Sequence, residues 1–270
     1  MMAMTAYSIL DLVPVVEGGT VPQALANAAD LAAHAETLGF TRFWVAEHHG
    51  MKGIASAATS VVIGHIAAAT KTIRVGAGGI MLPNHAPLVI AEQFGTLDAL
   101  YPGRIDLGLG RAPGSDQRVA HAIRRTLDSD PNAFVRDIVE LQSYFADDGR
   151  TGISATPGAG ADVPFYILGS SLYGAQVAAL LGLPYAFASH FAPQLLDEAL
   201  HVYRSDFKPS EFLDKPHAIA AMNVIAADSD AEAEFLASSI QQSFVGLRTG
   251  NPRQMQPPVE GYKESLPPHI

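Results

Sequence analysis

Apolar and polar positions follow two different patterns along the chain. Short, almost continuously apolar runs rich in β-branched and aromatic residues are typical of buried strands, and longer alanine-rich segments repeat their apolar positions with a helical period. Seven strand-like runs occur, at residues 7–13, 40–47, 72–82, 104–110, 163–168, 184–189 and 217–228. Helical segments follow them, at residues 20–39, 56–70, 87–103, 134–145, 171–182, 192–207 and 230–247. The pattern predicts seven consecutive βα units.

Continuously apolar strands that are each followed by a helix indicate a parallel sheet covered by helices. The first helix has clear boundary signals, with Thr20 as its cap, Pro22 in its first turn and Gly39 at its end. Repetition without a domain break favours the (β/α)8 fold, the TIM barrel, over a doubly wound sheet. A dinucleotide-binding sheet is further disfavoured because "PVVEGGTVP" follows the first strand in place of a G-x-G-x-x-G turn.

The predicted barrel lacks its eighth βα unit. Residues 248–270 are polar and proline-rich and contain no strand-like run. A parallel barrel without one strand would leave two open sheet edges. We therefore expect the native chain to continue past residue 270. Within a single domain of residues 1–270, we expect residues 248–270 to form a mobile tail or lid over the barrel mouth.

Composition narrows the class of protein. The 270 residues are 48% hydrophobic, which is enough for a large core, and the net charge of −10 disfavours nucleic acid and anionic membranes as partners. The absence of cysteine rules out disulfides and thiolate chemistry. No signal-peptide pattern is present, and no apolar stretch reaches the roughly 18 residues of a membrane helix. A soluble, cytoplasmic protein is expected.

Catalytic groups of such barrels lie at the carboxyl ends of the strands. Five predicted strand ends carry polar or glycine-rich motifs: "EHHG" at 47–50, "GAGGIMLPNHAP" at 76–87, "GLGRAPGSD" at 108–116, "LGSSLYG" at 168–174 and "SHFAP" at 189–193. In a barrel, these five motifs converge on one mouth.

Two of the motifs predict an anion site. Arg111 stands among glycines, Gly110 included, where backbone amides and a guanidinium can surround an anion. Ser170 and Ser171 open a helix whose free N–H groups and dipole favour phosphate. Taken singly, each motif is better explained as a glycine-rich turn or a serine N-cap. Their placement on adjacent strand ends favours a phosphate site.

Glu47, His48 and His49 stand together at the end of the second strand. Side chains of neighbouring strand residues start on opposite faces, so the two histidines are not expected to share a metal ion, and the chain has no H-x-H pair. No metal site is predicted. A histidine beside a carboxylate suits acid–base chemistry near neutral pH.

Two further features of the mouth loops are candidates for binding. Glycine inside a strand marks either a bend or a backbone pressed against a ligand, and both explanations remain open for Gly78 and Gly79. His85 and His190 are weaker candidates that we assign to the substrate pocket, and Asp116 also lies in a mouth loop.

Taken together, the motifs resemble those of the bacterial luciferase-like, flavin-dependent monooxygenase family. The matching segments are "GFTRFWVAEHHG", "IRVGAGGIMLPNHAPLVIAEQFGTLDALYPGRIDLGLGRAPGSD" and "VPFYILGSSLYGAQVAALLGLPYAFASHF". The resemblance covers residues 7 to about 247. It implies a TIM barrel that binds reduced FMN or, in some branches, the deazaflavin F420, and that forms a homodimer.

The resemblance also implies roles for individual residues. His48 falls on the active-site histidine, which assists proton transfer and stabilises a flavin hydroperoxide, and Glu47 and His49 support it. Gly78 and Gly79 fall on a non-proline cis peptide behind the flavin ring. The positions around the flavin phosphate and ring correspond to Arg111, Ser170, Ser171, Gly174 and Gly110.

The leading hypothesis is a monooxygenase that receives FMNH₂ from a separate reductase and uses O₂ to oxygenate a small organic substrate. Gly110 replaces a cysteine of the luciferase α chain, so light emission is not expected. The alternatives are an F420-dependent hydride-transfer oxidoreductase, a non-catalytic flavin-binding protein and, more remotely, a metal-dependent barrel hydrolase. The "EHH" motif favours FMN over F420.

Overall fold

Seven parallel strands form one sheet in the order of the sequence. The computed structural model describes residues 5–112, 117–123, 130 and 132–267. The strands are β1 (Ser8–Asp11), β2 (Arg42–Val45), β3 (Arg74–Met81), β4 (Ile105–Gly110), β5 (Phe165–Gly169), β6 (Tyr185–Phe187) and β7 (Ala218–Ala220). Each pairs in parallel with its neighbour, as the seven predicted βα units require.

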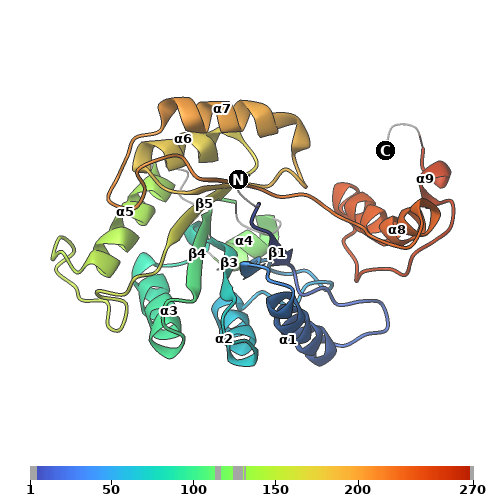
Figure 1. Cartoon of the computed structure of the whole chain (residues 1–270), viewed down its shortest axis with the longest axis horizontal. Helices are drawn as coiled ribbons and strands as arrows, with labels where there is room; N and C mark the ends of the chain where they lie inside the picture. The colour runs from blue at the N-terminus through green and yellow to red at the C-terminus, as the bar shows by residue number, and fades with distance from the viewer. Residues whose placement is uncertain (1–4, 113–116, 124–129, 131, 268–270) are drawn as a thin grey trace.

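Helices cover the outer face of this sheet (Figure 1). They are α1 (Val21–Thr37), α2 (Thr59–Ala69), α3 (Pro87–Leu100), α5 (Ala133–Ala146), α6 (Leu172–Leu181) and α7 (Leu196–Asp206). The connections after β3, β4 and β6 contain the 3-10 turn η1 (Leu82–Asn84), the short helix α4 (Gln117–Ile123) and the 3-10 turn η2 (Pro193–Leu195). Thr20 caps α1 by accepting from Gln23 N at 3.4 Å, as predicted. Helix α4 lies in a connection for which the sequence predicted no helix.

The sheet is an open half-barrel of seven strands, and the complete TIM barrel stays a prediction. Strands β1 and β7 are its two edges, and the part of the chain that the structure describes contains no eighth strand. The sequence predicted a seventh strand over residues 217–228, but only Ala218–Ala220 pair with β6. Beyond them Met222 and Val224 are 75% and 73% exposed, because the edge offers them no further strand to pack against.

The main core lies between the sheet and its helices. Phe43 and Val45 of β2, Val75 of β3 and Phe94 of α3 are among its fully buried side chains. A second, small cluster of Trp44, Tyr166 and Ala186 lies on the other face of the strands, inside the half-barrel. Because alternate residues of a strand point to opposite faces, Trp44 belongs to one cluster and its two neighbours to the other.

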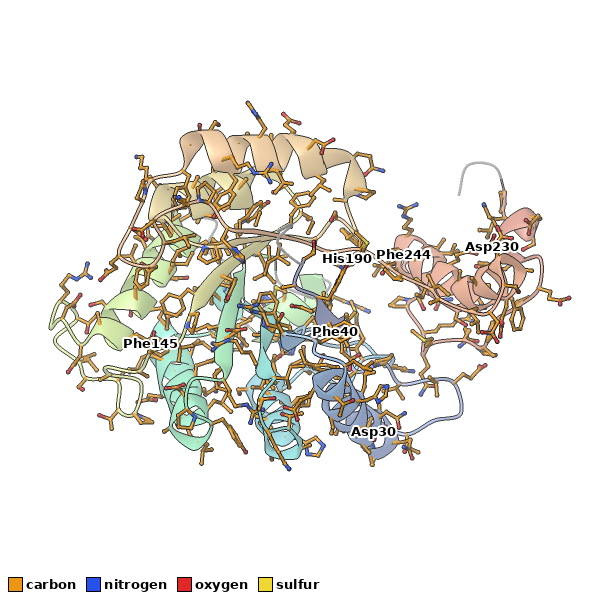
Figure 2. All side chains as sticks on the ribbon, in the orientation of Figure 1. Asp30, Phe40, Phe145, His190, Asp230 and Phe244 are labelled. Carbon is orange, nitrogen blue, oxygen red and sulfur yellow. The ribbon has the colours of Figure 1, made fainter. Side chains whose placement is uncertain are left out.

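Helices α8 (Asp230–Arg248) and α9 (Tyr262–Ser265) lie apart from the sheet. Ser229 caps α8, and the predicted helix over residues 230–247 is confirmed, but Ser238 is its only buried residue. Figure 2 shows Asp230 and Phe244 on this separate part, away from the side chains packed around the sheet. Helix α8 therefore does not cover the sheet as the helix of a seventh βα unit would.

The segment after α8 forms hydrogen bonds both with that helix and with the loop that follows β1. Val259 N donates to Ser238 Oγ at 2.8 Å, while Met255 N donates to Val15 O at 3.1 Å and Glu17 N to Met255 O at 2.9 Å. Met255 thus lies beside the loop that follows β1, while Val259 lies beside α8. The expected role of residues 248–270 as a mobile lid stays a prediction.

None of the helices that the structure describes combines the length and apolar character needed to cross a membrane.

Candidate functional site

Glu47 is the centre of a hydrogen-bonded cluster at the carboxyl ends of β2 and β3. Its side chain is fully buried, and its Oε1 lies 2.7 Å from His49 Nε2 and 3.1 Å from Asn84 Nδ2, which donates to it. Its Oε2 lies 2.9 Å from His85 Nε2 and accepts from Met81 N at 2.9 Å. The sequence analysis predicted that Glu47 and His49 lie together. It did not predict the contacts of Asn84 and Met81 with Glu47, and it assigned His85 to the substrate pocket.

These contacts keep the buried carboxyl group ionised. Burial acts to raise the pKa of Glu47, but the hydrogen bond and charge of His85 and the bonds from His49 and Met81 outweigh it, and the pKa is lowered. The ligand atoms of Glu47, His49 and His85 all lie within 4.8 Å of one another, an arrangement that also suits a metal ion. The sequence did not predict it because His85 comes from a different strand end.

His48 lies outside this cluster. Its ring is half-buried, and within the described residues its buried Nδ1 has no hydrogen-bond partner. Burial lowers the pKa of His48, so its imidazole is neutral near pH 7. His190, after β6, shares both properties: a buried Nδ1 without a partner in the described part of the chain and a pKa lowered by burial.

The peptide bond between Gly78 and Gly79 is cis, as the resemblance implied. Glu47 N donates to Gly79 O at 3.2 Å, so the cis peptide lies directly beside the Glu47 residue. A Cβ on Gly79 would meet Gly108 O at 2.6 Å, and one on Gly78 would meet Leu10 Cδ1 at 2.7 Å. Gly79 is therefore required by its close approach to the backbone of the neighbouring strand β4, whereas a side chain at Gly78 would meet the end of the flexible Leu10 side chain.

Arg111 connects the end of β4 with the start of α6. Its guanidinium lies 4.2 Å from the centre of the Tyr173 ring, a cation–π contact that the sequence did not reveal. Ser171 is the N-cap of α6, and its side chain makes no capping hydrogen bond. The exposed Arg111 and Ser171 thus stand near free helix N–H groups, where an anion is favoured.

The remaining predicted positions lie around this helix terminus. Ser170 is half-buried, and Gly174 is buried against Gly169, since its added Cβ would lie 3.3 Å from Gly169 Cα. Gly110 packs against Met81, whose Sδ would be 3.0 Å from an added Cβ. Asp116 lies outside the described residues.

A second buried polar network lies toward the amino ends of the strands. Asp106 is fully buried and accepts from Arg42 Nε at 3.1 Å, Arg74 Nε at 2.7 Å and Trp44 Nε1 at 3.0 Å. Arg42 also donates to Tyr166 Oη at 2.9 Å. Its place, away from the carboxyl ends of the strands, indicates a structural role.

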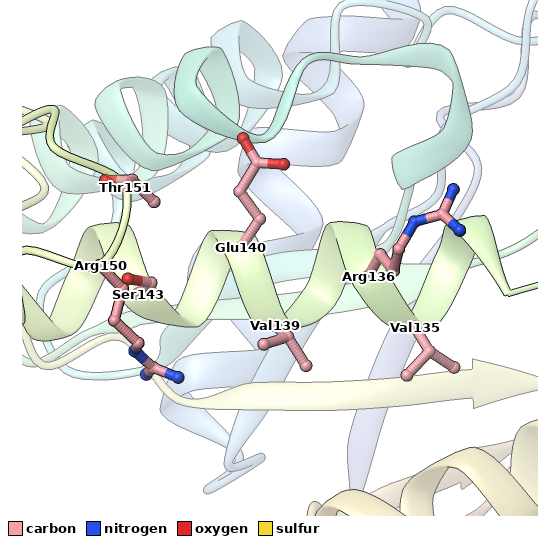
Figure 3. A pocket seen from close by; sticks show the side chains of 7 residues that line it. All are labelled: Val135, Arg136, Val139, Glu140, Ser143, Arg150 and Thr151. Atoms are coloured by element: carbon pink, nitrogen blue, oxygen red, sulfur yellow. The ribbon is translucent and has the colours of Figure 1, made fainter.

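Two hollows in the described part of the surface lie away from the cluster of polar strand ends. A depression of about 330 Å³ lies on the outer side of α5 (Figure 3), lined by Val135, Arg136, Val139, Glu140, Ser143, Arg150 and Thr151. Its arginines pair with Asp130 and Asp148. A second, of about 170 Å³, lies between α8 and residues 259–264. We assign the site to the strand ends, where the polar groups converge.

Comparison with known proteins identifies the chain as an oxidoreductase of the monooxygenase class. A family model described as luciferase-like monooxygenase matches residues 6–265. The chain belongs to the luciferase-like monooxygenase family, which confirms the resemblance of its motifs.

Several relatives support this assignment. A luciferase-like monooxygenase of Escherichia coli K12 is 57% identical over 264 residues, which cover 97% of this chain and 79% of the relative. The N-acetyl-S-alkylcysteine monooxygenase of Bacillus subtilis is 35% identical, covering 92% of this chain and 75% of the relative. The solved structure of apo-MsnO8 has a TM-score of 0.88 at 37% identity and covers 94% of this chain and 76% of that one.

Proposed function

We propose that this protein is a flavin-dependent monooxygenase that takes reduced FMN from a separate reductase and uses O₂ to oxygenate a small organic substrate. The observation that carries the proposal is the polar cluster of Glu47, His49 and His85 at the strand ends, where Glu47 N also binds the backbone of Gly79. A homodimer is part of this proposal.

The residues at the strand ends fit a flavin. Gly78 and Gly79 lie beside Glu47 at a strand end, where we propose that the flat ring of the flavin lies. Arg111 and the start of α6 offer a cation, a cap hydroxyl and free N–H groups to a phosphate. Among similar folds, a type II Baeyer–Villiger monooxygenase was solved in complex with FMN, at a TM-score of 0.69 and 17% identity.

The protein side chains supply binding and proton handling. When bound, reduced FMN provides the electrons that activate O₂. His48, neutral and with an unpaired Nδ1, holds or moves a proton at that atom. Arg111 and Ser171 bind the phosphate and so fix the position of the ring.

A deazaflavin is the competing cofactor. An F420-dependent secondary alcohol dehydrogenase has a similar fold, with a TM-score of 0.67 at 18% identity. A cofactor of this kind supports hydride transfer without O₂, so the two functions differ in their need for oxygen. The relative that oxygenates N-acetyl-S-alkylcysteine favours the monooxygenase.

The test is product analysis with FMN, a flavin reductase and NADPH, with and without O₂, using thioethers, aldehydes and ketones as substrates. We expect O₂-dependent products and a loss of about 10²–10⁴-fold in turnover for His48→Ala with FMN binding retained. His34→Ala, on the exposed surface of α1, is the matched control. Oxygen-independent turnover with F420, or unchanged turnover of His48→Ala, would contradict the proposal.

A further inference from the structure

We propose that Glu47 is a positioning residue that keeps a proton on Nε2 of both His49 and His85, so that Nδ1 is the nitrogen of each ring that takes up or releases a proton. As a consequence, the mouth contains two oriented bases in addition to His48. Their use in catalysis rests on the proposed function, whereas the tautomers themselves follow from the cluster alone.

The first step is that both oxygens of Glu47 are fully engaged as acceptors. Met81 N and Asn84 Nδ2 are donors whatever the state of the histidines, and they lie 2.9 Å and 3.1 Å from the carboxylate. Its side chain is 0% exposed, so no bulk water completes its hydration. A buried carboxyl group surrounded by donors is ionised and accepts only.

The second step concerns the rings. His49 Nε2 lies 2.7 Å from Oε1, and His85 Nε2 lies 3.0 Å and 2.9 Å from the two oxygens. An acceptor-only partner requires a proton on each Nε2, because two lone pairs at these distances would repel. In a neutral imidazole the other nitrogen, Nδ1, is then the base. Glu47 thus decides which nitrogen of each ring takes a proton.

The third step fixes the place of these bases. Glu47 N donates to Gly79 O, so the residue that orients the rings also binds the backbone of the cis peptide. The side chains of His49 and His85 are 20% and 26% exposed, in contrast to the carboxylate, so the rings reach from the core toward the mouth. Both bases are therefore held beside the backbone where the flavin ring is proposed to lie.

The test is long-range ¹H–¹⁵N NMR of the ring nitrogens in the flavin-free, ¹⁵N-histidine-labelled protein. His49→Asn and His85→Asn variants assign the two rings. At a pH at which the rings are neutral, we expect both to show a protonated Nε2 and an unprotonated Nδ1 in the wild type. The amide of Glu47→Gln has only one accepting oxygen and cannot accept from both rings. At least one ring should therefore change tautomer, so that its proton is found on Nδ1 and no longer on Nε2. Glu36→Gln removes another carboxylate that accepts several N–H groups, and should leave both rings unchanged.

Three results would overturn the proposal. They are Nδ1–H rings in the wild type, unchanged rings in Glu47→Gln, and stoichiometric binding of added Zn²⁺ with both rings as ligands, which would make the cluster a metal site. The wild-type spectrum is informative even if Glu47→Gln does not fold. Because flavin is absent, failure of flavin binding in a separate titration would refute the proposed function and leave the tautomers standing.

Discussion

Replacing Asp106 by alanine should destabilise the fold strongly. The carboxylate is fully buried, and it accepts from Arg42, Arg74 and Trp44. Removing one partner of a buried ion pair costs about 3–5 kcal/mol, since the other charge is left uncompensated. The side chains of Arg42 and Arg74 are 21% and 26% exposed and regain some water, so we expect the lower end, about 3 kcal/mol in the free energy of unfolding.

Urea unfolding measures this loss. Trp44 is the only tryptophan of the chain, but its indole contacts Asp106, so far-UV circular dichroism should accompany its fluorescence. Asp130→Ala is the matched control, because its exposed pair with Arg136 adds little stability and should leave the midpoint nearly unchanged. A loss below about 1 kcal/mol for Asp106→Ala would refute the reasoning that the network stabilises the half-barrel.

Three further predictions concern acid stability, packing and cofactor binding. Burial raises the pKa of Glu36, but backbone N–H groups of residues 71–73 outweigh it and lower the pKa from 4.5 to about 2. Its stabilisation is therefore present above pH 4.5 and lost toward pH 2, and thermal midpoints of Glu36→Gln should fall less steeply over this range than those of the wild type. Gly79→Ala places a Cβ 2.6 Å from Gly108 O and should cost about 1–3 kcal/mol by calorimetry; an unchanged midpoint would contradict the close packing. Arg111→Ala should weaken the affinity for FMN about 10–100-fold in a fluorescence titration, because it removes a charged hydrogen bond to the phosphate. The affinity for riboflavin, which lacks the phosphate, should not change. Equal losses for FMN and riboflavin would refute a phosphate contact.

Apolar runs and helix-cap residues predicted the strands and helices well where a strand has a neighbouring strand on both sides. The apolar run at residues 40–47 became β2, and Thr20 capped α1. The run at residues 217–228 failed as a strand after Ala220, because a strand at the sheet edge depends on partners and not on its own apolar residues. Helix α8 formed as predicted with Ser229 as its cap, but its local sequence did not predict that it lies away from the sheet.

The sequence predicted the motifs of the candidate site but not the hydrogen bonds that join them. The resemblance indicated the cis peptide at Gly78, whereas the contact of His85 with Glu47 joins two strand ends 38 residues apart. The η1 turn sets that contact, and no spacing rule reports it. The Asp106 network did leave a signal: Arg42 and Arg74 stand in register on neighbouring strands, and Asp106 pairs with Gly76, two residues after Arg74.

The central claim is that the strand ends bind a flavin against Gly78 and Gly79. Its most direct test is a titration of the purified chain with FMN, reduced FMN and F420, followed by flavin absorbance and fluorescence under anaerobic conditions. The account predicts saturable binding of one reduced FMN per chain, tighter than that of F420. Absence of saturable binding of any of the three, or binding of F420 with exclusion of FMN, would contradict it.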